Sequence, residues 1–384
     1  MSLSQMTPRQ RLLAALRGQE VDRIPWSPYL VWWWENQSQI IQSMGQPAFI
    51  RYVGADCLLR GFSTVCKSSR IWTAVHTDAI DFTLPFMDDR CEFREHEKNG
   101  EFMYQFVTPV GSLQMASRYG GKALVPIPKE YPVKTKEDYK VLSYLVENMQ
   151  FAPNFEPNDR AIRMLGEDGL YVPVVTPLLK TPFQALLEHF VGVQNLAYHM
   201  ADFRETVEDL LALMNARARE TLLIAAESPA EVLITYESSS TRTMSPAWFA
   251  LYVAPVIRDW AQILHSANKL LLHHACGHLR GLLPIMADEG ADAIESVTPP
   301  SLGDVEIWNA QKALEGRVGI IGGIEAVFFE RCTLEELRSY LTDTLLPRID
   351  PRRFILANAD SCPLGVTFEK FQIVTDVVRQ WKVG

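Results

Sequence analysis

The chain has 384 residues, enough for one large domain or two ordinary ones with a sizeable core. Hydrophobic residues make up 47% and charged residues 22%, close to the globular average, which excludes a disordered chain and a fibrous repeat. The net charge of −9 repels nucleic-acid phosphates and anionic lipid. We therefore expect neither nucleic acid nor a membrane surface as a partner.

The six cysteines are too few for a disulfide scaffold, and no two of them form a CxxC pair. The N-terminal segment MSLSQMTPRQRLLAALRG lacks the uninterrupted apolar core of a signal peptide. No run reaches the ~18 apolar residues that a membrane span needs. We expect a cytoplasmic protein in a reducing compartment, where a chemically active cysteine is a metal ligand or a nucleophile.

The N-terminal part is predicted to contain a helix, two strands and an antiparallel insertion. Thr7 can cap a helix whose leucines recur on one face. Short apolar runs over residues 24–30 and 54–59 are typical of buried strands. Over residues 78–130, apolar and polar residues alternate around Asn99-Gly100, a pair typical of hairpin turns. We therefore expect a β-hairpin insertion in this N-terminal third.

Past residue 165, Val/Ile/Leu-rich runs alternate with amphipathic segments, the pattern of a parallel sheet covered by helices. The predicted strands are 171–176, 231–236, 270–275, 291–297, 318–324 and 353–359, and the helices are 181–190, 194–227, 245–267, 279–289, 305–314, 333–344 and 366–382. With the two earlier strands the total is eight, which closes a (β/α)₈ TIM barrel. An open doubly wound sheet is the alternative, but no GxGxxG follows the first strand. We predict one α/β barrel domain over residues 1–384.

Potential metal ligands and acids stand at the predicted C-terminal strand ends, where barrel enzymes carry their active sites. His274 and Cys276 are two residues apart, so in a strand both side chains face the same side and can meet one ion. Zinc suits this mixed nitrogen and sulfur ligation. The alternative is a buried histidine beside a small apolar cysteine. Cys362, just past the last strand, is the predicted third ligand, with Asp360 as the alternative.

Other residues are candidates for acid–base chemistry and substrate binding. Glu237 and Glu295 end neighbouring strands and are predicted to be catalytic, although strand-end glutamates are as often solvated rim residues. Gly322-Gly323 allows close approach of a ligand, or marks a turn with positive φ. Aromatic residues that would line a substrate pocket are Trp32, Trp33, Trp34 and Tyr236.

Five segments carry a recognisable pattern: TPRQRLLAALRGQEVDRIPW, TPVGSL, LLHHACGHLRGLLPIMADEGADAIES, RVGIIGGIEA and FILANADSCPLGV. They resemble the uroporphyrinogen decarboxylase superfamily, and the resemblance spans residues 7–382. The resemblance implies a (β/α)₈ barrel. True decarboxylases of this superfamily use no metal and carry an arginine-rich segment after the first strand that holds the substrate's carboxylates. The matching segment here, YLVWWWENQ, has no arginine.

The other branch, the corrinoid-dependent methyltransferases, binds zinc through His-x-Cys and a distant cysteine. His274 and Cys276 match the first two ligands. Asp360 aligns with the third ligand of the methylcobalamin:thiol enzymes, and Cys362 follows two residues later. The resemblance therefore implies one catalytic Zn²⁺ and an O-demethylase type of methyl transfer from a methoxylated compound. The corrinoid would arrive on a small partner protein, because the chain has no D-x-H-x-x-G corrinoid motif.

Three alternatives stay open at this point. A methylcobalamin:thiol methyltransferase would reverse the direction of transfer, with a small molecule as methyl acceptor instead of donor. A metal-free decarboxylase-like enzyme would need a cationic pocket. A non-catalytic barrel that binds a tetrapyrrole would keep its ligand without His274 or Cys276. A homodimer is one candidate assembly.

Overall fold

The computed structural model describes residues 5–69, 87–119 and 126–381. The chain folds into two compact units, one made of Met1–Gly61, Glu156–Pro173 and Pro229–Gly384, the other of Phe62–Phe155 and Val174–Ser228. The single barrel domain of the sequence analysis stays a prediction. Among the described residues, no helix combines the length and apolar character that crossing a membrane requires.

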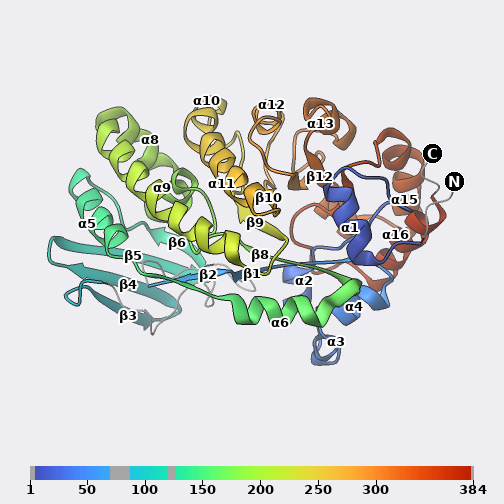
Figure 1. The fold of residues 1–384 in the computed structure, drawn as a ribbon, viewed down its shortest axis with the longest axis horizontal. Coiled ribbons are helices and arrows are strands. Elements are labelled where there is room, and N and C mark those ends of the chain that lie inside the picture. The colour runs from blue at the N-terminus through green and yellow to red at the C-terminus, as the bar shows by residue number, and fades with distance from the viewer. Residues whose placement is uncertain (1–4, 70–86, 120–125, 382–384) are drawn as a thin grey trace. The chain divides into compact units, whose positions relative to one another are not determined.

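A seven-stranded sheet forms the centre of the first unit, as the ribbon in Figure 1 shows. Its order is β1 (Cys57–Thr64), β8 (Gly169–Val174), β9 (Val232–Tyr236), β10 (Leu270–His274), β11 (Ala293–Val297), β12 (Gly319–Ile324) and β13 (Phe354–Asn358). The strands from β9 to β13 pair in parallel. Every residue of β9, β11, β12 and β13 is buried, as expected for parallel strands covered on both faces.

The predicted strand at 24–30 lies between the two ends of this sheet. Trp26 forms a parallel bridge with Leu356 of β13, and the Ser27 amide donates to the Leu356 carbonyl at 2.9 Å. On its other side, the Asp56 amide donates to the Trp26 carbonyl at 2.7 Å, just before β1. The segment therefore takes the place of an eighth strand, and the α/β fold is a curled, TIM-like barrel.

Helices of the first unit alternate with these strands. They are α1 (Pro8–Leu16), α2 (Val31–Glu35), α3 (Gln39–Met44), α4 (Gln46–Tyr52), α6 (Phe155–Leu165), α10 (Pro246–Trp248), α11 (Ala254–Ser266), α12 (Leu283–Met286), α13 (Ile307–Ala313), α14 (Ala326–Arg331), α15 (Leu334–Ser339) and α16 (Phe368–Gln380). Thr7 caps α1 as predicted, in a capping box with Gln10. The segment 279–289 is helical only over α12, so the prediction there was too long.

The second unit contains a four-stranded antiparallel sheet of β3 (Glu92–Lys98), β4 (Glu101–Thr108), β5 (Gly111–Tyr119) and β6 (Pro126–Glu130). The turn between β3 and β4 is Asn99-Gly100, where both residues have positive φ. The unit also holds the short pair β2 (Cys66–Ser68) and β7 (Phe151–Pro153), with helices α5 (Lys136–Glu147), α7 (Pro182–Ala185), α8 (Val193–Asp202) and α9 (Arg204–Glu227). Residues 78–86 and 120–125 of the predicted insertion lie outside the described residues.

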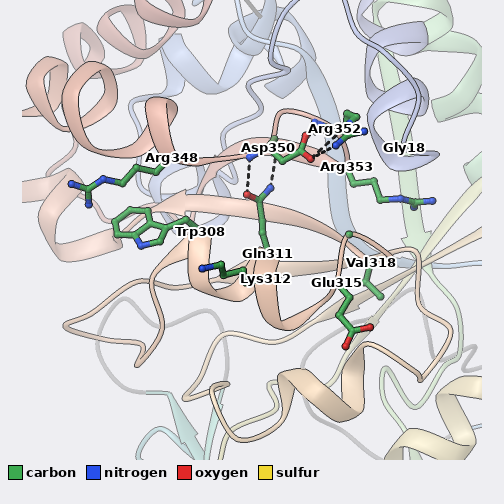
Figure 2. A pocket seen from close by; sticks show the side chains of 11 residues that line it. Gly18, Trp308, Gln311, Lys312, Glu315, Val318, Arg348, Asp350, Arg352 and Arg353 are labelled. Carbon is green, nitrogen blue, oxygen red and sulfur yellow. Dashed lines mark hydrogen bonds and ion pairs between the residues drawn. The ribbon is translucent and has the colours of Figure 1, made fainter. Parts of the chain in front are cut away.

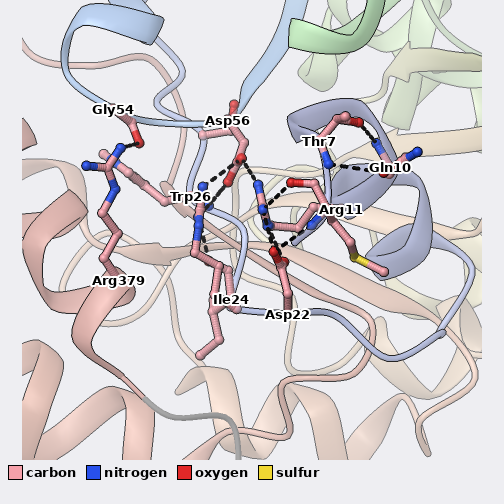
Figure 3. A network of polar contacts seen from close by, with 12 residues as sticks. Thr7, Gln10, Arg11, Asp22, Ile24, Trp26, Gly54, Asp56 and Arg379 are labelled. Carbon is pink, nitrogen blue, oxygen red and sulfur yellow. Dashed lines mark hydrogen bonds and ion pairs between the residues drawn. The ribbon is translucent and has the colours of Figure 1, made fainter. Parts of the chain in front are cut away.

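A buried ion-pair network ties α1 to the start of β1 (Figure 3). Arg11 Nη1 lies 2.6 Å from Asp56 Oδ1, and Arg11 Nε lies 2.6 Å from Asp22 Oδ1. Arg23 Nη1 pairs with Asp56 Oδ2 at 2.8 Å. The Trp26 amide also donates to Asp56, so one fully buried carboxylate joins the helix, the eighth-strand segment and β1.

We predict that Asp56→Ala lowers the free energy of unfolding by about 3–5 kcal/mol, because Arg11 then loses a buried counter-charge. Urea denaturation at neutral pH measures the change. Asp168→Ala is the matched control, since Asp168 pairs with Arg51 at the surface, where a salt bridge contributes less than about 1 kcal/mol. Equal losses in the two variants would contradict the role of the network.

Candidate metal site

Three metal-ligand side chains lie together at the C-terminal ends of β10 and β13. They are His274, Cys276 and Asp360, whose ligand atoms all lie within 4.8 Å of one another. His274 ends β10, while Cys276 and Asp360 each come two residues after the end of a strand. His274 is buried and the other two are half-buried. In the ranges that the structure describes, no other three such side chains come together in this way.

Strand register explains why His274 faces this group. His274 lies opposite Tyr236 on β9 and Glu295 on β11, so the three side chains leave the sheet on the same side. His273 leaves on the opposite side, where its Nδ1 is 2.6 Å from Glu289 and its Nε2 is 3.1 Å from Ser239. Because successive side chains of a strand point to opposite faces, His273 packs away from His274 and its neighbours.

Glu295 holds the His274 imidazole in place. Its Oε2 contacts His274 Nδ1 and accepts a hydrogen bond from Ser296 Oγ at 3.0 Å, while its Oε1 lies 3.1 Å from Arg60 Nε. Burial disfavours the carboxylate, but His274 and Arg60 outweigh it and lower the pKa of Glu295. Glu295 therefore stays ionised and orients His274, and its predicted catalytic role stays a prediction.

Asp360 is placed by the turn that follows β13. Its φ of 64° is left-handed, a conformation that aspartate tolerates better than most residues. Its amide donates to Ser296 Oγ at 3.0 Å, and its Oδ1 accepts from the Ser361 amide at 2.7 Å. Ser296 thus contacts both Glu295 and Asp360. This hydrogen bonding joins the third ligand to the network that orients His274.

Cys362, the preferred third ligand of the sequence analysis, is not brought to this group. Its thiol is fully buried and faces the Pro363 carbonyl at 3.8 Å. Burial, with the charge of Glu330, raises the pKa of the Cys362 thiol well above its ordinary value. The left-handed turn at Asp360 ends the strand alternation, so the carboxylate and not the thiol faces His274. The alternative ligand, Asp360, takes that place.

Glu237 lies on the side of the sheet opposite to His274. It is fully buried and accepts a hydrogen bond from Thr235 Oγ1 at 2.5 Å. Thr235 is in register with His273, which lies on that side of the sheet. There, burial raises the pKa of Glu289, and the charge of Glu237 raises it further. The predicted role of Glu237 as a catalytic acid stays a prediction.

The three adjacent tryptophans take different roles. Trp33 and Trp34 are buried against Phe49, with ring centroids 4.9 and 5.9 Å apart, and Trp33 Nε1 donates to the Val366 carbonyl. Both pack in the core, which was the alternative to substrate binding. Trp32 is 43% exposed and remains a candidate for a ligand or partner surface.

Two tyrosines flank His274. The ring centroids of Tyr236 and Tyr29 lie 5.0 and 6.2 Å from that of the imidazole. Tyr29 Oη donates to Tyr236 Oη at 3.3 Å, and Tyr236 Oη donates to the Gly61 carbonyl at 3.2 Å. Burial raises the pKa of both phenols, so they stay protonated. Tyr236 therefore lies beside His274, and its role in substrate binding stays a prediction.

Sequence reasoning missed Tyr29 and Arg60. Tyr29 belongs to the eighth-strand segment, and its backbone exchanges two hydrogen bonds with the Asn358 side chain of β13. The Arg60 guanidinium is buried on β1, 4.6 Å from the centroid of the Tyr29 ring. The signal for Arg60 was its place inside the apolar run CLLRGF, because an arginine in a buried strand needs a partner.

The glycine pair on β12 serves packing. A Cβ on Gly322 would lie 2.6 Å from the Val297 carbonyl oxygen, so only glycine allows β11 to approach this closely. Gly323 has a φ of 117°, which other residues rarely adopt. The structure therefore explains both glycines without close approach of a ligand.

A pocket of about 750 Å³ lies at the opposite, N-terminal ends of the strands (Figure 2). Its walls come from α13 and from the segment before β13, and include Trp308, Lys312, Arg348 and Arg353. The Arg348 guanidinium lies 4.8 Å from the Trp308 ring centroid. The ligand-bearing strand ends are at the other side of the barrel, so this basal pocket is separate from the candidate metal site.

The curled parallel sheet, with ligand-type residues at its C-terminal strand ends, defines a TIM-like α/β barrel protein. A family model described as Uroporphyrinogen decarboxylase (URO-D) matches residues 116–381, and the chain belongs to that family. The solved structure of a methyltransferase from Methanosarcina mazei is similar, with a TM-score of 0.62 over 98% of this chain and 99% of that one. At 14% identity this likeness shows a shared fold. No curated protein sequence matches the chain.

We predict that Glu295→Gln lowers the free energy of unfolding by about 3–5 kcal/mol, because the buried Arg60 charge loses its counter-charge. Urea denaturation at neutral pH measures the loss, and a double variant with Arg60→Met should recover part of it. Glu92→Gln is the control, since Glu92 pairs with Arg94 at the surface. A Glu295→Gln variant as stable as this control would show that the pair is not needed for folding.

Proposed function

We propose that the protein is a zinc-dependent methyltransferase, which moves a methyl group between a small substrate and the corrinoid of a partner protein. The observation that carries the proposal is the group of His274, Cys276 and Asp360, within 4.8 Å of one another at the C-terminal strand ends. Family membership and the fold shared with a methyltransferase support it. Cytoplasmic location and homodimeric assembly remain expectations of the sequence.

The donor set fits zinc. An imidazole nitrogen, a thiolate and a carboxylate are its ordinary ligands, and three of them leave a fourth tetrahedral position for substrate. Glu295 contacts Nδ1 of His274, which leaves Nε2 for the ion, as in other carboxylate–histidine–zinc arrangements. When bound, zinc supplies a Lewis acid that stabilises negative charge on the oxygen that loses its methyl group.

The chain's own residues would prepare and enclose this position. Glu295 and Ser296 together hold His274 and Asp360 in one hydrogen-bonded network. Tyr29 and Tyr236 place two protonated phenols next to the buried imidazole. We favour a methoxylated substrate over a thiol, because Asp360 stands where the resemblance places a cysteine in the thiol-methylating enzymes.

Metal analysis tests the proposal. The protein purified under reducing, chelator-free conditions is expected to hold about one zinc per chain, and His274→Ala, Cys276→Ser and Asp360→Ala are expected to lose it, since each removes one of three ligands. Cys362→Ser is the matched control and should keep its zinc, because that thiol contacts the Pro363 carbonyl and does not belong to the group of three ligands. A metal-free wild-type protein would overturn the proposal and favour the decarboxylase-like alternative.

The direction of transfer is tested with free cobalamin. With cob(I)alamin and a methoxylated compound, the methyl group moves to cobalt, the C–O bond breaks, and the leaving oxygen takes a proton. We expect the absorption of methylcob(III)alamin to appear with the wild-type protein and not with His274→Ala. Methylation of an added thiol by methylcob(III)alamin, without the forward reaction, would instead support the thiol-methylating alternative.

A further inference from the structure

Arg60 on β1 is a buried charge with two hydrogen-bond donors that lack an acceptor, and it lies near the candidate metal ligands. Its side chain has no exposed surface, and its guanidinium carries five N–H donors. Nη1 makes a long hydrogen bond of 3.4 Å to the Leu58 carbonyl. Nε lies 3.1 Å from Glu295 Oε1 but is not aligned for a hydrogen bond, and Nη2 has no acceptor among the described residues. A buried donor without an acceptor is uncommon and calls for an explanation, and a bound ligand that supplies the acceptor is one.

The described residues around Arg60 offer no acceptor to Nη2. Glu295 Oε2 contacts His274 and accepts from Ser296, and Oε1, which makes no hydrogen bond of its own, lies beside Nε and not Nη2. The two phenol protons near Arg60 are used as well, since Tyr29 donates to Tyr236 and Tyr236 donates to the Gly61 carbonyl. The guanidinium lies over the Tyr29 ring, whose face offers a cation–π contact but no acceptor oxygen.

Arg60 is also next to the metal ligands. Glu295 contacts Arg60 through one oxygen and His274 through the other, so a single carboxylate separates the guanidinium from the imidazole. Tyr29 lies beside both Arg60 and His274, and Tyr236 lies beside His274 and Tyr29. A small molecule bound beside His274 would therefore be close enough to contact Arg60 as well.

We infer that Arg60 binds a carboxylate of the substrate, which makes that substrate a carboxylic acid and not a neutral methyl compound. This inference rests on the proposed function, since it takes the metal ligands as the place of reaction. A carboxylate oxygen on Nη2 satisfies a buried donor, and charge-assisted hydrogen bonds to arginine are about twice as strong as neutral ones. Arg60 is thus a specificity residue. It lies outside YLVWWWENQ, the segment that matches the arginine-rich segment of the decarboxylases.

The test uses para-fluorobenzoate and its neutral analogue para-fluorobenzamide as probes, with binding followed by fluorine NMR. The full-length wild-type protein is expected to bind the benzoate more tightly than the benzamide. Arg60→Met is expected to weaken benzoate binding about 10- to 100-fold and to leave benzamide unchanged, because one charged hydrogen bond is lost. Arg348→Met is the matched control, since it removes an exposed arginine of the basal pocket and should change neither affinity.

Each further outcome decides the inference. Arg60→Lys keeps the charge without the planar donors, so it should weaken benzoate binding as well. If Arg60→Met does not fold, the double variant Arg60→Met/Glu295→Gln is used in its place, because it leaves no unpaired charge at these two positions. Benzoate affinity that is unchanged in these variants, or that falls equally in Arg348→Met, would overturn the inference.

Repeating the measurement after removal of zinc separates this inference from the proposed function. Benzoate binding that survives zinc removal and depends on Arg60 supports a carboxylate subsite, whatever the metal content proves to be. Benzoate binding that depends only on zinc would mean that the carboxylate binds the ion, and would overturn the role of Arg60. A protein without zinc that still binds benzoate through Arg60 would overturn the proposed function alone.

Discussion

The buried carboxylate of Glu295 is the interaction on which the candidate site depends. It lies between His274 and Arg60, and neither it nor the Arg60 side chain has exposed surface. A charge this far from water is tolerated only when it is paired and hydrogen-bonded. Here His274 and Ser296 contact Oε2 of Glu295, and Arg60 lies 3.1 Å from Oε1 as the counter-charge. The same contact leaves Nε2 of the imidazole for an ion. The Glu295 carboxylate therefore both stabilises the fold and orients the His274 imidazole for an ion.

Parallel pairing creates that interaction. Tyr236, His274 and Glu295 are neighbours in register on β9, β10 and β11, so their side chains meet on the same side of the sheet without long loops. The opposite side carries its own buried group of Thr235, His273 and Glu289. Two adjacent histidines thus serve separate networks, because successive side chains of a strand point in opposite directions.

Much of this could be predicted from the sequence. The alternation of apolar runs and helical segments located the strands, and the i, i+2 spacing placed His274 and Cys276 together. The third ligand could not be chosen the same way, because strand periodicity ends at the left-handed turn of Asp360. Only the folded backbone shows which side chain past the strand points toward His274. Arg60 was missed because its partner, Glu295, is far along the chain. The close packing of Trp33 and Trp34 on Phe49 likewise depends on contacts that adjacency in sequence does not reveal.

The central claim is that His274, Cys276 and Asp360 hold one zinc ion, with Cys362 outside the site. X-ray absorption at the zinc edge tests it most directly, because sulfur ligands lie at about 2.3 Å and nitrogen or oxygen ligands at about 2.0–2.2 Å. We predict one sulfur among the ligands of the zinc ion, and the same spectrum in the Cys362→Ser variant. Two sulfur ligands, with one lost in Cys362→Ser, would contradict it.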